Sequence, residues 1–207
     1  MYNLPAFQET DTANIHTAIR SARLANFVTA TGHGLLASPL PLFLDSEEGP
    51  NGVLYGHLAR ANPQWKAVPI GEAMAIFMGP DAYVTPSWYQ SKLETGKVVP
   101  TWNYITVQAF GSVEFFDDAG RLLEVVTRLT HIHEQSRAVP WAVDDAPASY
   151  IQSQLRGIVG LRIPISRLEA KRKMSQNKSV NDRAGVIQGL ASSDDERDRI
   201  VAGFVPG

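Results

Sequence analysis

The segment from Gly56 to Pro63 combines residue types that bind anions with one that titrates near neutral pH. It reads Gly-His-Leu-Ala-Arg-Ala-Asn-Pro, and Asn62 followed by Pro63 predicts a capped helix start after a strand. Free backbone N–H groups at a helix start attract anions, and Arg60 could add a fork of donors to a phosphate. The segment therefore predicts a phosphate site with His57 as a titratable neighbour. The alternative is an ordinary capped helix with a surface arginine and a packed histidine.

His131, His133 and Glu134 form a stretch whose residue types could ligate a metal. On a helix only His131 and Glu134 share a face, because residues three apart are neighbours and residues two apart are not. Two ligands rarely make a metal site, so the stretch is interpreted as a helix surface and no metal is predicted. Neither a P-loop nor a G-x-G-x-x-G motif occurs, and no Ser-His-Asp order can be argued, so no catalytic residue is assigned.

The composition limits the classes of protein to which this chain can belong. A chain of 207 residues with 44% hydrophobic content is typical of one globular domain with a small appendage. The formal net charge is −2, whereas a nucleic-acid-binding chain typically carries a net positive charge. The absence of cysteine excludes disulfides and thiolate ligands, and it fits a cytoplasmic protein. Neither a signal peptide nor a membrane-spanning segment is expected.

Hydrophobic periodicity and turn residues predict many short strands and few helices. Asp11 is expected to cap a first helix, and later helices are expected over 122–132, over 148–155 and from Val180 onward. Strands are predicted over 27–31, 35–44, 53–58, 73–78, 82–85, 103–116 and 158–165, with a turn at Gly79-Pro80-Asp81 and a bulge at Gly111. The pattern favours a mainly β, α+β fold, a small antiparallel barrel with helices packed outside. Residues 1–170 would form the barrel domain, and residues 171–207 a basic segment with a helical tail.

Six short motifs stand in order along the chain. They are Pro39-Leu40-Pro41-Leu42, Gly56-His57-Leu58-Ala59-Arg60-Ala61-Asn62-Pro63, Phe77-Met78-Gly79-Pro80, Tyr83-Val84-Thr85-Pro86-Ser87-Trp88-Tyr89, Pro100-Thr101-Trp102-Asn103-Tyr104 and Lys173-Met174-Ser175-Gln176-Asn177. The ordered set resembles the PaiB-type family, the FMN-binding negative transcriptional regulators of bacteria. The resemblance runs over nearly the whole chain and implies an FMN-binding split β-barrel like that of the pyridoxamine-phosphate oxidases. It also implies a homodimer with flavin at the subunit interface.

The resemblance implies a cofactor role for three residues of the first segment. In the wider fold, a strand with basic residues runs into an Asn-Pro helix start and helps to hold the flavin phosphate. Arg60 and Asn62 match that arrangement, so Arg60 is expected to hold the phosphate. His57 precedes them on the same predicted strand and is expected to lie at the flavin as well.

Thr101, Trp102 and Asn103 lie at the start of the longest predicted strand and are further candidates for the flavin. An aromatic face can stack on an isoalloxazine ring, and Thr or Asn can hydrogen-bond its polar edge. The alternative is that Trp102 and Tyr104 are core or interface anchors. The aromatics near loops exceed what one barrel interior needs, which favours an obligate dimer: Trp65, Trp88, Tyr89, Trp102 and Tyr104.

Lys173, Ser175 and Gln176 follow the last predicted strand and are expected to reach a flavin ring or phosphate, from the partner subunit of a dimer. The competing interpretation is a solvated basic turn, because a basic cluster gathers here: Lys171, Arg172, Lys173 and Lys178. This cluster is also the candidate for DNA phosphates. No helix-turn-helix pattern lies beside it, so direct DNA affinity is expected to be weak.

Two classes of function are consistent with these residues. The first is an FMN-binding, cytoplasmic homodimer that acts in transcriptional repression, with the flavin as its bound or sensed ligand. The alternative is an FMN-dependent oxidoreductase on the same barrel, in which the cofactor carries the redox chemistry and His57 is the proton donor. A dimer that has lost its flavin and a haem-handling barrel are more distant alternatives.

Overall fold

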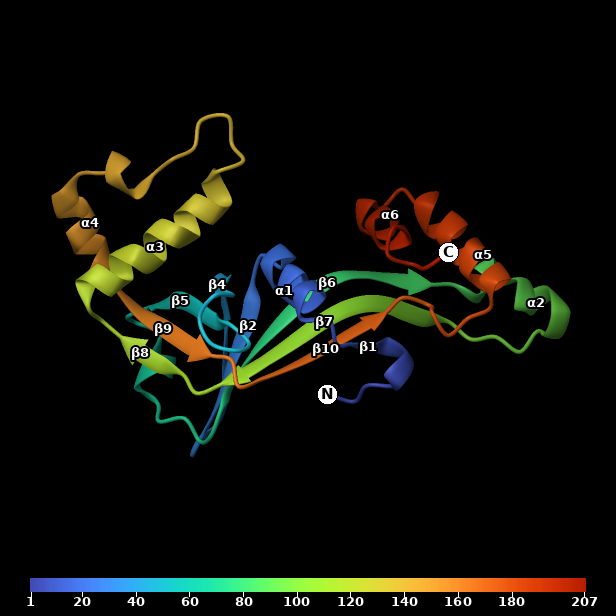
Figure 1. Cartoon of the computed structure of the whole chain (residues 1–207), viewed down its shortest axis with the longest axis horizontal. Helices are drawn as coiled ribbons and strands as arrows, with labels where there is room; N and C mark the ends of the chain where they lie inside the picture. The colour runs from blue at the N-terminus through green and yellow to red at the C-terminus, as the bar shows by residue number, and fades with distance from the viewer. The chain divides into compact units, whose positions relative to one another are not determined.

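The computed structural model describes residues 1–207, and the chain divides into two compact units (Figure 1). Unit 1 comprises residues 1–18, 78–107 and 169–207, and unit 2 comprises residues 19–77 and 108–168. This division differs from the predicted boundary at residue 170, because residues 169–207 form one unit with two segments from earlier in the chain. No helix has the length and apolar character needed to cross a membrane.

The strands form two sheets, and every pairing whose register is defined is antiparallel, as predicted for a barrel. The six-stranded sheet has the order β1-β10-β7-β6-β2-β3, and the four-stranded sheet has the order β4-β5-β9-β8. The strands are β1 Gln8–Glu9, β2 Ala25–Thr31, β3 Gly34–Leu40, β4 Leu42–Asp45, β5 Val53–Ala59, β6 Ala73–Val84, β7 Thr101–Gly111, β8 Glu114–Phe116, β9 Ile158–Pro164 and β10 Arg167–Lys173.

The predicted helices are confirmed, and capping side chains mark the start of four of the six helices. The helices are α1 Thr12–Ser21, α2 Gln90–Thr95, α3 Ala119–Glu134, α4 Ala148–Leu155, α5 Val180–Ala191 and α6 Glu196–Ala202. Asp11 Oδ1 accepts a hydrogen bond from the Asn14 N–H at 3.0 Å and caps α1 as expected. Asp118 caps α3, and Ser179 caps α5, in the same way. Four short 3-10 turns complete the chain: η1 Pro5–Phe7, η2 Pro63–Lys66, η3 Pro86–Trp88 and η4 Val143–Asp145.

Unit 2 is built on two hairpins and one long helix. Strands β2 and β3 pair from Ala25↔Leu40 to Thr31↔Gly34, and Gly34 has a φ of 110° that permits the tight turn. In the four-stranded sheet β5 pairs with both β4 and β9. Helix α3 lies along β5 and β9 (Figure 1) and buries its apolar stripe in a cluster of Phe43, Phe116, Leu122, Val125, Leu129 and Leu155.

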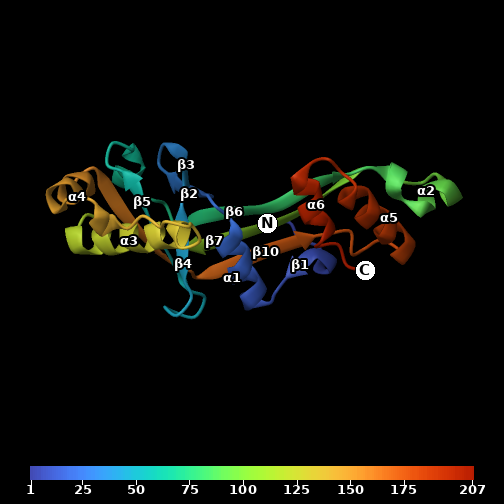
Figure 2. The same cartoon turned by 90° about the horizontal axis from the view of Figure 1, so that it is seen from above.

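Unit 1 has its own apolar core, in which α5 and α6 pack next to each other, as both views show (Figures 1 and 2). A methyl group added at Gly189 would lie 2.3 Å from the Trp88 ring, and one at Gly185 would lie 1.9 Å from the Trp88 carbonyl oxygen. These two glycines therefore let η3 lie directly against α5. The buried core residues are Ala82, Val84, Tyr89, Met174, Val186, Leu190, Val201, Ala202 and Val205.

Three strand predictions are wrong in their boundaries. The predicted turn at Gly79-Pro80-Asp81 lies inside the continuous strand β6. The predicted strand over 35–44 is broken at Pro41, which donates no N–H to a ladder, and its halves β3 and β4 join different sheets. The predicted strand over 103–116 is likewise divided after Gly111 into β7 and β8. The basic segment after residue 170 is part of a further strand, β10, rather than a turn.

Candidate functional site

Six of the nine predicted cofactor residues lie together in unit 1, where β7 begins and β10 ends. We call this group the β7–β10 corner: Thr101, Trp102, Asn103, Lys173, Ser175 and Gln176. The Lys173 ammonium donates to Thr101 Oγ1 and to the Trp102 carbonyl oxygen, and Ser175 Oγ donates to Asn103 Oδ1 at 3.0 Å. These partners are about 72 residues apart in the chain. The sheet therefore brings together two motifs that the sequence alone does not connect.

Local backbone conformation fixes the second half of the corner. Ser175 has a φ of 60°, in the left-handed region that non-glycine residues rarely adopt. Gln176 stabilises this turn, because its Oε1 accepts from the Met174 N–H at 2.6 Å and its Nε2 donates to the Arg172 carbonyl oxygen. The side chain of Gln176 is therefore committed to the backbone of the turn, and it positions Ser175 rather than pointing to a ligand.

Asn103 has an unpaired donor at the centre of the corner. Its side chain is fully buried, and its Nδ2 has no hydrogen-bond partner, whereas its Oδ1 is held by Ser175. A buried N–H without an acceptor costs about 1–3 kcal/mol. The Asn103 amide is thus oriented with a free N–H for an acceptor that the protein itself does not supply.

Trp102 offers an accessible aromatic surface at the same corner. Its side chain is 53% exposed, and its ring meets that of Tyr83 edge to face with centroids 5.8 Å apart. Tyr83 is 47% exposed, whereas its neighbours Ala82 and Val84 are buried against α5 and α6. The pair therefore lies on the face of the sheet that these helices leave open. An exposed indole beside lysine and amide donors fits a flat ligand with carbonyl groups at its edge, such as a flavin.

The other predicted aromatics are used within the protein. Trp88 packs on α5, and Tyr89 is 2% exposed with an unpaired hydroxyl group. Burial raises the pKa of Tyr89, and the Asp182 carboxylate raises it further. Trp65 donates its indole N–H to the Arg60 carbonyl oxygen at 2.9 Å. Of the five aromatics expected at an interface, Trp102 is the largely exposed one.

The remaining three predicted residues, His57, Arg60 and Asn62, lie in unit 2. The helix start expected at Pro63 is only η2, a four-residue 3-10 turn. Asn62 caps it, accepting from the Gln64 N–H at 2.9 Å, and donates to Ser38 Oγ at 2.8 Å. One turn offers no extended row of aligned dipoles, so the helix dipole on which the expected anion site was based is not formed here, and the site itself stays a prediction.

Arg60 directs its donors at backbone carbonyl groups. Its Nε donates to the Arg156 oxygen at 2.8 Å and its Nη2 to the Ile158 oxygen at 3.1 Å, while Asp117 lies 3.5 Å from Nη1. The guanidinium therefore holds the turn between α4 and β9. The expected phosphate role of Arg60 stays a prediction. His57 has an unpaired, buried Nδ1, and burial lowers its pKa.

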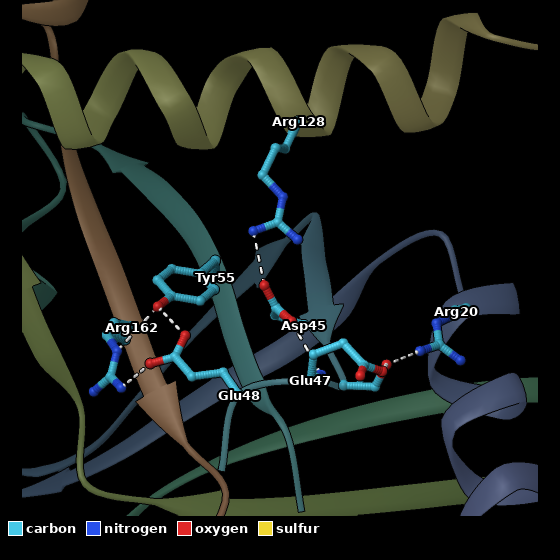
Figure 3. A network of polar contacts seen from close by, with 8 residues as sticks. Arg20, Asp45, Glu47, Glu48, Tyr55, Arg128 and Arg162 are labelled. Carbon is cyan, nitrogen blue, oxygen red and sulfur yellow. Dashed lines mark hydrogen bonds and ion pairs between the residues drawn. The ribbon is translucent and has the colours of Figure 1, made fainter.

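Unit 2 also contains a charged cavity that the sequence did not predict. Figure 3 shows the polar contacts among its lining residues. It has a volume of about 230 Å³ and lies between α3 and the strands β4, β5 and β9. Arg128 pairs with Asp45 at 2.9 Å, Arg162 pairs with Glu48, and the Tyr55 hydroxyl donates to Glu48 at 2.6 Å. These pairs join residues that are 83 and 114 residues apart, so no local sequence signal marks them. The principal charges of this cavity are already paired with one another. We therefore interpret these ion pairs as contacts that hold the helix against the sheet.

The stretch from His131 to Glu134, which the sequence indicated to be a helix surface, ends α3. Glu134 pairs with Arg137 at 3.0 Å and accepts from the Trp141 N–H at 3.1 Å. This carboxylate fixes the loop that follows the helix.

The chain is similar to known proteins over most of its length. The family model described as "Putative FMN-binding domain" matches residues 1–167. Uncharacterized protein AN0679 of Emericella nidulans is 34% identical over 99% of this chain and 96% of its own length. Protease synthase and sporulation protein PAI 2 of Bacillus subtilis is 30% identical over 94% of this chain and 91% of its own length.

Solved structures agree on the fold. The FAD and heme binding protein from Mycobacterium smegmatis matches with a TM-score of 0.57 at 18% identity, over 80% of this chain and 73% of its own. At that identity the likeness concerns the fold alone, which is the split β-barrel predicted from the sequence. The family match and the two relatives show that this chain belongs to the PaiB-type family of FMN-binding domain proteins.

Proposed function

We propose that this protein binds FMN and that the isoalloxazine ring lies at the β7–β10 corner. The observation that carries the proposal is the exposed Trp102 indole next to the unpaired Asn103 N–H. The two residues are adjacent on β7 and point to opposite faces of it, with Trp102 exposed and Asn103 buried, so the ring would stack on Trp102 and the Asn103 amide would face it from beneath the surface. Membership of an FMN-binding family supports the choice of flavin.

The corner residues have distinct parts in this proposal. Trp102 supplies the stacking surface, and Asn103 donates to an acceptor at the polar edge of the ring. Thr101, Ser175 and Gln176 position these groups through the hydrogen bonds described above. Bound FMN supplies a ring that can take up and return electrons. His57, Arg60 and Asn62 remain proposed contacts from unit 2.

A titration of flavin-free protein with FMN, followed by flavin fluorescence, tests this site. Wild type should quench the fluorescence saturably at one flavin per chain, because an indole stacked on the ring quenches it. Replacing Trp102 with Leu or Asn103 with Leu should weaken binding about tenfold or more, since each removes a contact worth about 1 kcal/mol or more. Tyr150→Leu, which removes an exposed aromatic on α4, is the matched control and should bind like wild type. Equal affinities in all four proteins would place the flavin elsewhere.

We further propose that the protein acts as a homodimeric, cytoplasmic regulator of transcription rather than as a redox enzyme. The resemblance to negative regulators supports this role, and the Bacillus subtilis relative is named a sporulation protein. The oxidoreductase alternative is less supported, because the family match describes flavin binding and names no reaction.

Direct DNA binding by the basic cluster is not part of this proposal. Lys171 is buried, and Arg172 stacks on the Phe204 ring and donates to the Phe204 carbonyl oxygen at 3.3 Å. Lys178 lies over the Tyr89 ring. These groups are therefore engaged inside unit 1 and do not form a solvated face. A gel shift with the promoter fragment of its own gene should show weak binding at physiological salt, and tight sequence-specific binding would contradict this.

A further inference from the structure

Unit 2 has a second pocket, between α3, η4 and α4, which contains none of the residues proposed to bind flavin. Helices α3 and α4 lie side by side in both views (Figures 1 and 2), and the pocket between them has a volume of about 310 Å³. Its lining residues recur at helical spacing, with Leu123 and Thr127 four apart on α3, and Ala148 and Ile151 three apart on α4. One face of each helix therefore borders this space.

The floor of the pocket, which we define as Leu123, Val143 and Ile151, is aliphatic. These three side chains are half-buried, and Leu123 and Ile151 also pack against the core of unit 2. No basic side chain lines the pocket. The floor therefore offers apolar contact to a hydrocarbon group, and the pocket offers no counter-charge to an anion.

The rim of the pocket, which we define as Thr127, Asp144 and Gln152, is polar and exposed. The Asp144 carboxylate forms no ion pair or hydrogen bond, whereas its neighbour Asp145 accepts from the Ala142 N–H at 2.9 Å. A carboxylate beside an apolar floor complements a cation that carries a hydrocarbon group. The Thr127 hydroxyl and the Gln152 carbonyl oxygen can accept further N–H bonds from an ammonium.

Hydrogen bonds hold the walls of the pocket in place without a ligand. Glu134 accepts from the Trp141 N–H at 3.1 Å, which fixes the loop after α3. The bond to Asp145 closes η4, and the Ile151 N–H donates to the Pro147 carbonyl oxygen at 3.0 Å at the start of α4. The pocket is therefore preformed, and a ligand has little ordering cost to overcome.

We propose that this pocket binds a small organic cation, a primary ammonium on a compact aliphatic body. The ammonium pairs with Asp144, and the hydrocarbon packs on the floor. A volume of about 310 Å³ lies at the lower end of the range for small-molecule sites, so a ligand of about ten non-hydrogen atoms fits. The inference goes beyond the proposed flavin binding and uses residues of unit 2 alone.

A titration of the full-length protein with cyclohexylmethylamine, followed by methyl NMR, tests the pocket. This probe has no aromatic ring that could stack on Trp102. The methyl signals of Leu123, Val143 and Ile151 should shift saturably, with a Kd of about 0.1–1 mM for a ligand of about eight non-hydrogen atoms. Cyclohexylmethanol, the neutral analogue, should bind about tenfold more weakly, and cyclohexanecarboxylate should give no saturable shift.

Two variants separate the charge of the pocket from its space. Asp144→Asn should weaken amine binding about tenfold and leave the affinity for cyclohexylmethanol unchanged, because it removes the charge alone. Ala148→Trp should abolish binding of both by filling the pocket, and it should leave the melting temperature unchanged because position 148 is exposed. Glu94→Gln, at an exposed carboxylate on α2, is the matched control and should bind the amine like wild type.

Several results would overturn the proposal. Methyl shifts confined to other residues would place the amine elsewhere, and equal affinities for the amine, the alcohol and the carboxylate would remove the selection for a cation. Wild-type amine affinity in Asp144→Asn would do the same. An amine affinity that falls as the protein concentration rises would show that a second copy of the chain occupies the pocket.

The flavin-site variant Trp102→Leu keeps this inference separate from flavin binding. It should bind the amine like wild type, even where it no longer binds FMN. A failure of flavin binding alone would therefore leave the cation pocket in place. Loss of amine binding in Trp102→Leu would contradict the assignment of the amine to unit 2.

Discussion

The Asn103 amide and the Ser175 hydroxyl form a hydrogen-bonded pair in which one donor, the Asn103 Nδ2, has no acceptor. Both residues are buried, Ser175 holds a φ of 60°, and Asn103 Nδ2 has no acceptor. An unpaired buried N–H and a left-handed serine each cost free energy in the ligand-free protein. Such costs accumulate where a site is organised for a ligand, so stability and binding should respond in opposite ways to changes here.

The double variant Asn103→Leu/Ser175→Ala separates these effects. Removing both members of the pair leaves no unpaired polar group, so its free energy of unfolding should match or exceed that of wild type. FMN affinity should fall by about tenfold, because the donor to the ring is lost. Ser38→Ala is the control: it breaks a buried bond of 2.7 Å to Gln64 and should destabilise by about 1 kcal/mol. A double variant as unstable as a cavity mutant would show that the pair is structural only.

The carboxylates of Asp45 and Glu48 predict how the protein responds to acid. Hydrogen bonding to Arg128 lowers the pKa of Asp45, and hydrogen bonds from Arg162 and Tyr55 lower the pKa of Glu48. A carboxyl group whose folded-state pKa lies below its unfolded value stabilises the fold above that unfolded value, here 3.8 and 4.5. That stability is lost as the pH falls through the folded-state pKa.

The free energy of unfolding should therefore begin to fall near pH 4.5 and keep falling below pH 3.8. Arg128→Met and Arg162→Met should flatten this decrease, and each should cost about 1 kcal/mol or less at pH 7, because the pairs are partly exposed. Urea unfolding measured at a series of pH values tests this. A decrease that is equally steep in the variants would assign the acid sensitivity to other groups.

At the scale of elements, glycines that allow two backbones to approach closely explain why some predicted turns and bulges were wrong. Gly79 and Pro80 are typical turn residues, yet β6 continues through them because Gly79 lets the backbone approach β7: an added Cβ would lie 3.0 Å from the Ile105 Cβ. Gly111, predicted as a bulge, lies against β9, where a Cβ would lie 2.0 Å from the Pro164 oxygen. Hydrophobic periodicity predicted most strands and helices. Whether a glycine forms a turn or allows another strand to approach closely depends on residues far away in the sequence.

The contact of η3 with α5 gives a test at this scale. Gly189→Ala should gain about 1 kcal/mol of helix propensity, yet it should destabilise the protein by about 1–3 kcal/mol because the methyl group collides with the Trp88 ring. Gly203→Ala, at the end of α6 with φ of −68° and no close neighbour, should be neutral or slightly stabilising. Thermal unfolding of both variants decides this, and a more stable Gly189→Ala would contradict the packing of Trp88 on α5.

At the scale of the whole molecule, the family motifs carried most of the site prediction. They singled out the six residues of the β7–β10 corner, but the sheet of one chain brings the two halves together across 72 residues, where the sequence analysis expected one half to come from a partner subunit. The motifs did not reveal that Arg60 binds backbone carbonyl groups or that Lys171 is buried, because both depend on partners 96 and 169 residues away in the chain. The prediction of a helix that begins at Pro63 is wrong, because the chain forms only a single capped 3-10 turn there.

One aromatic surface is the candidate for the dimer interface. Because Trp88, Tyr89 and Trp65 are used internally, we expect the second copy to contact the open face around Trp102 and Tyr83, where the most exposed of the five predicted interface aromatics lies. Sedimentation at micromolar concentration should give twice the chain mass for wild type. Tyr83→Lys should shift the equilibrium toward monomer by placing a charge in the interface, whereas Tyr150→Lys on α4 should not. A wild-type monomer would remove the dimer from this account.

The central claim is that this chain binds FMN, and the visible absorption spectrum of the freshly purified protein tests it most directly. The account predicts flavin bands, with a released cofactor whose mass is that of FMN and a yield approaching one flavin per chain after reconstitution. A protein that remains colourless after incubation with excess FMN, or one that shows haem bands instead, would contradict the claim.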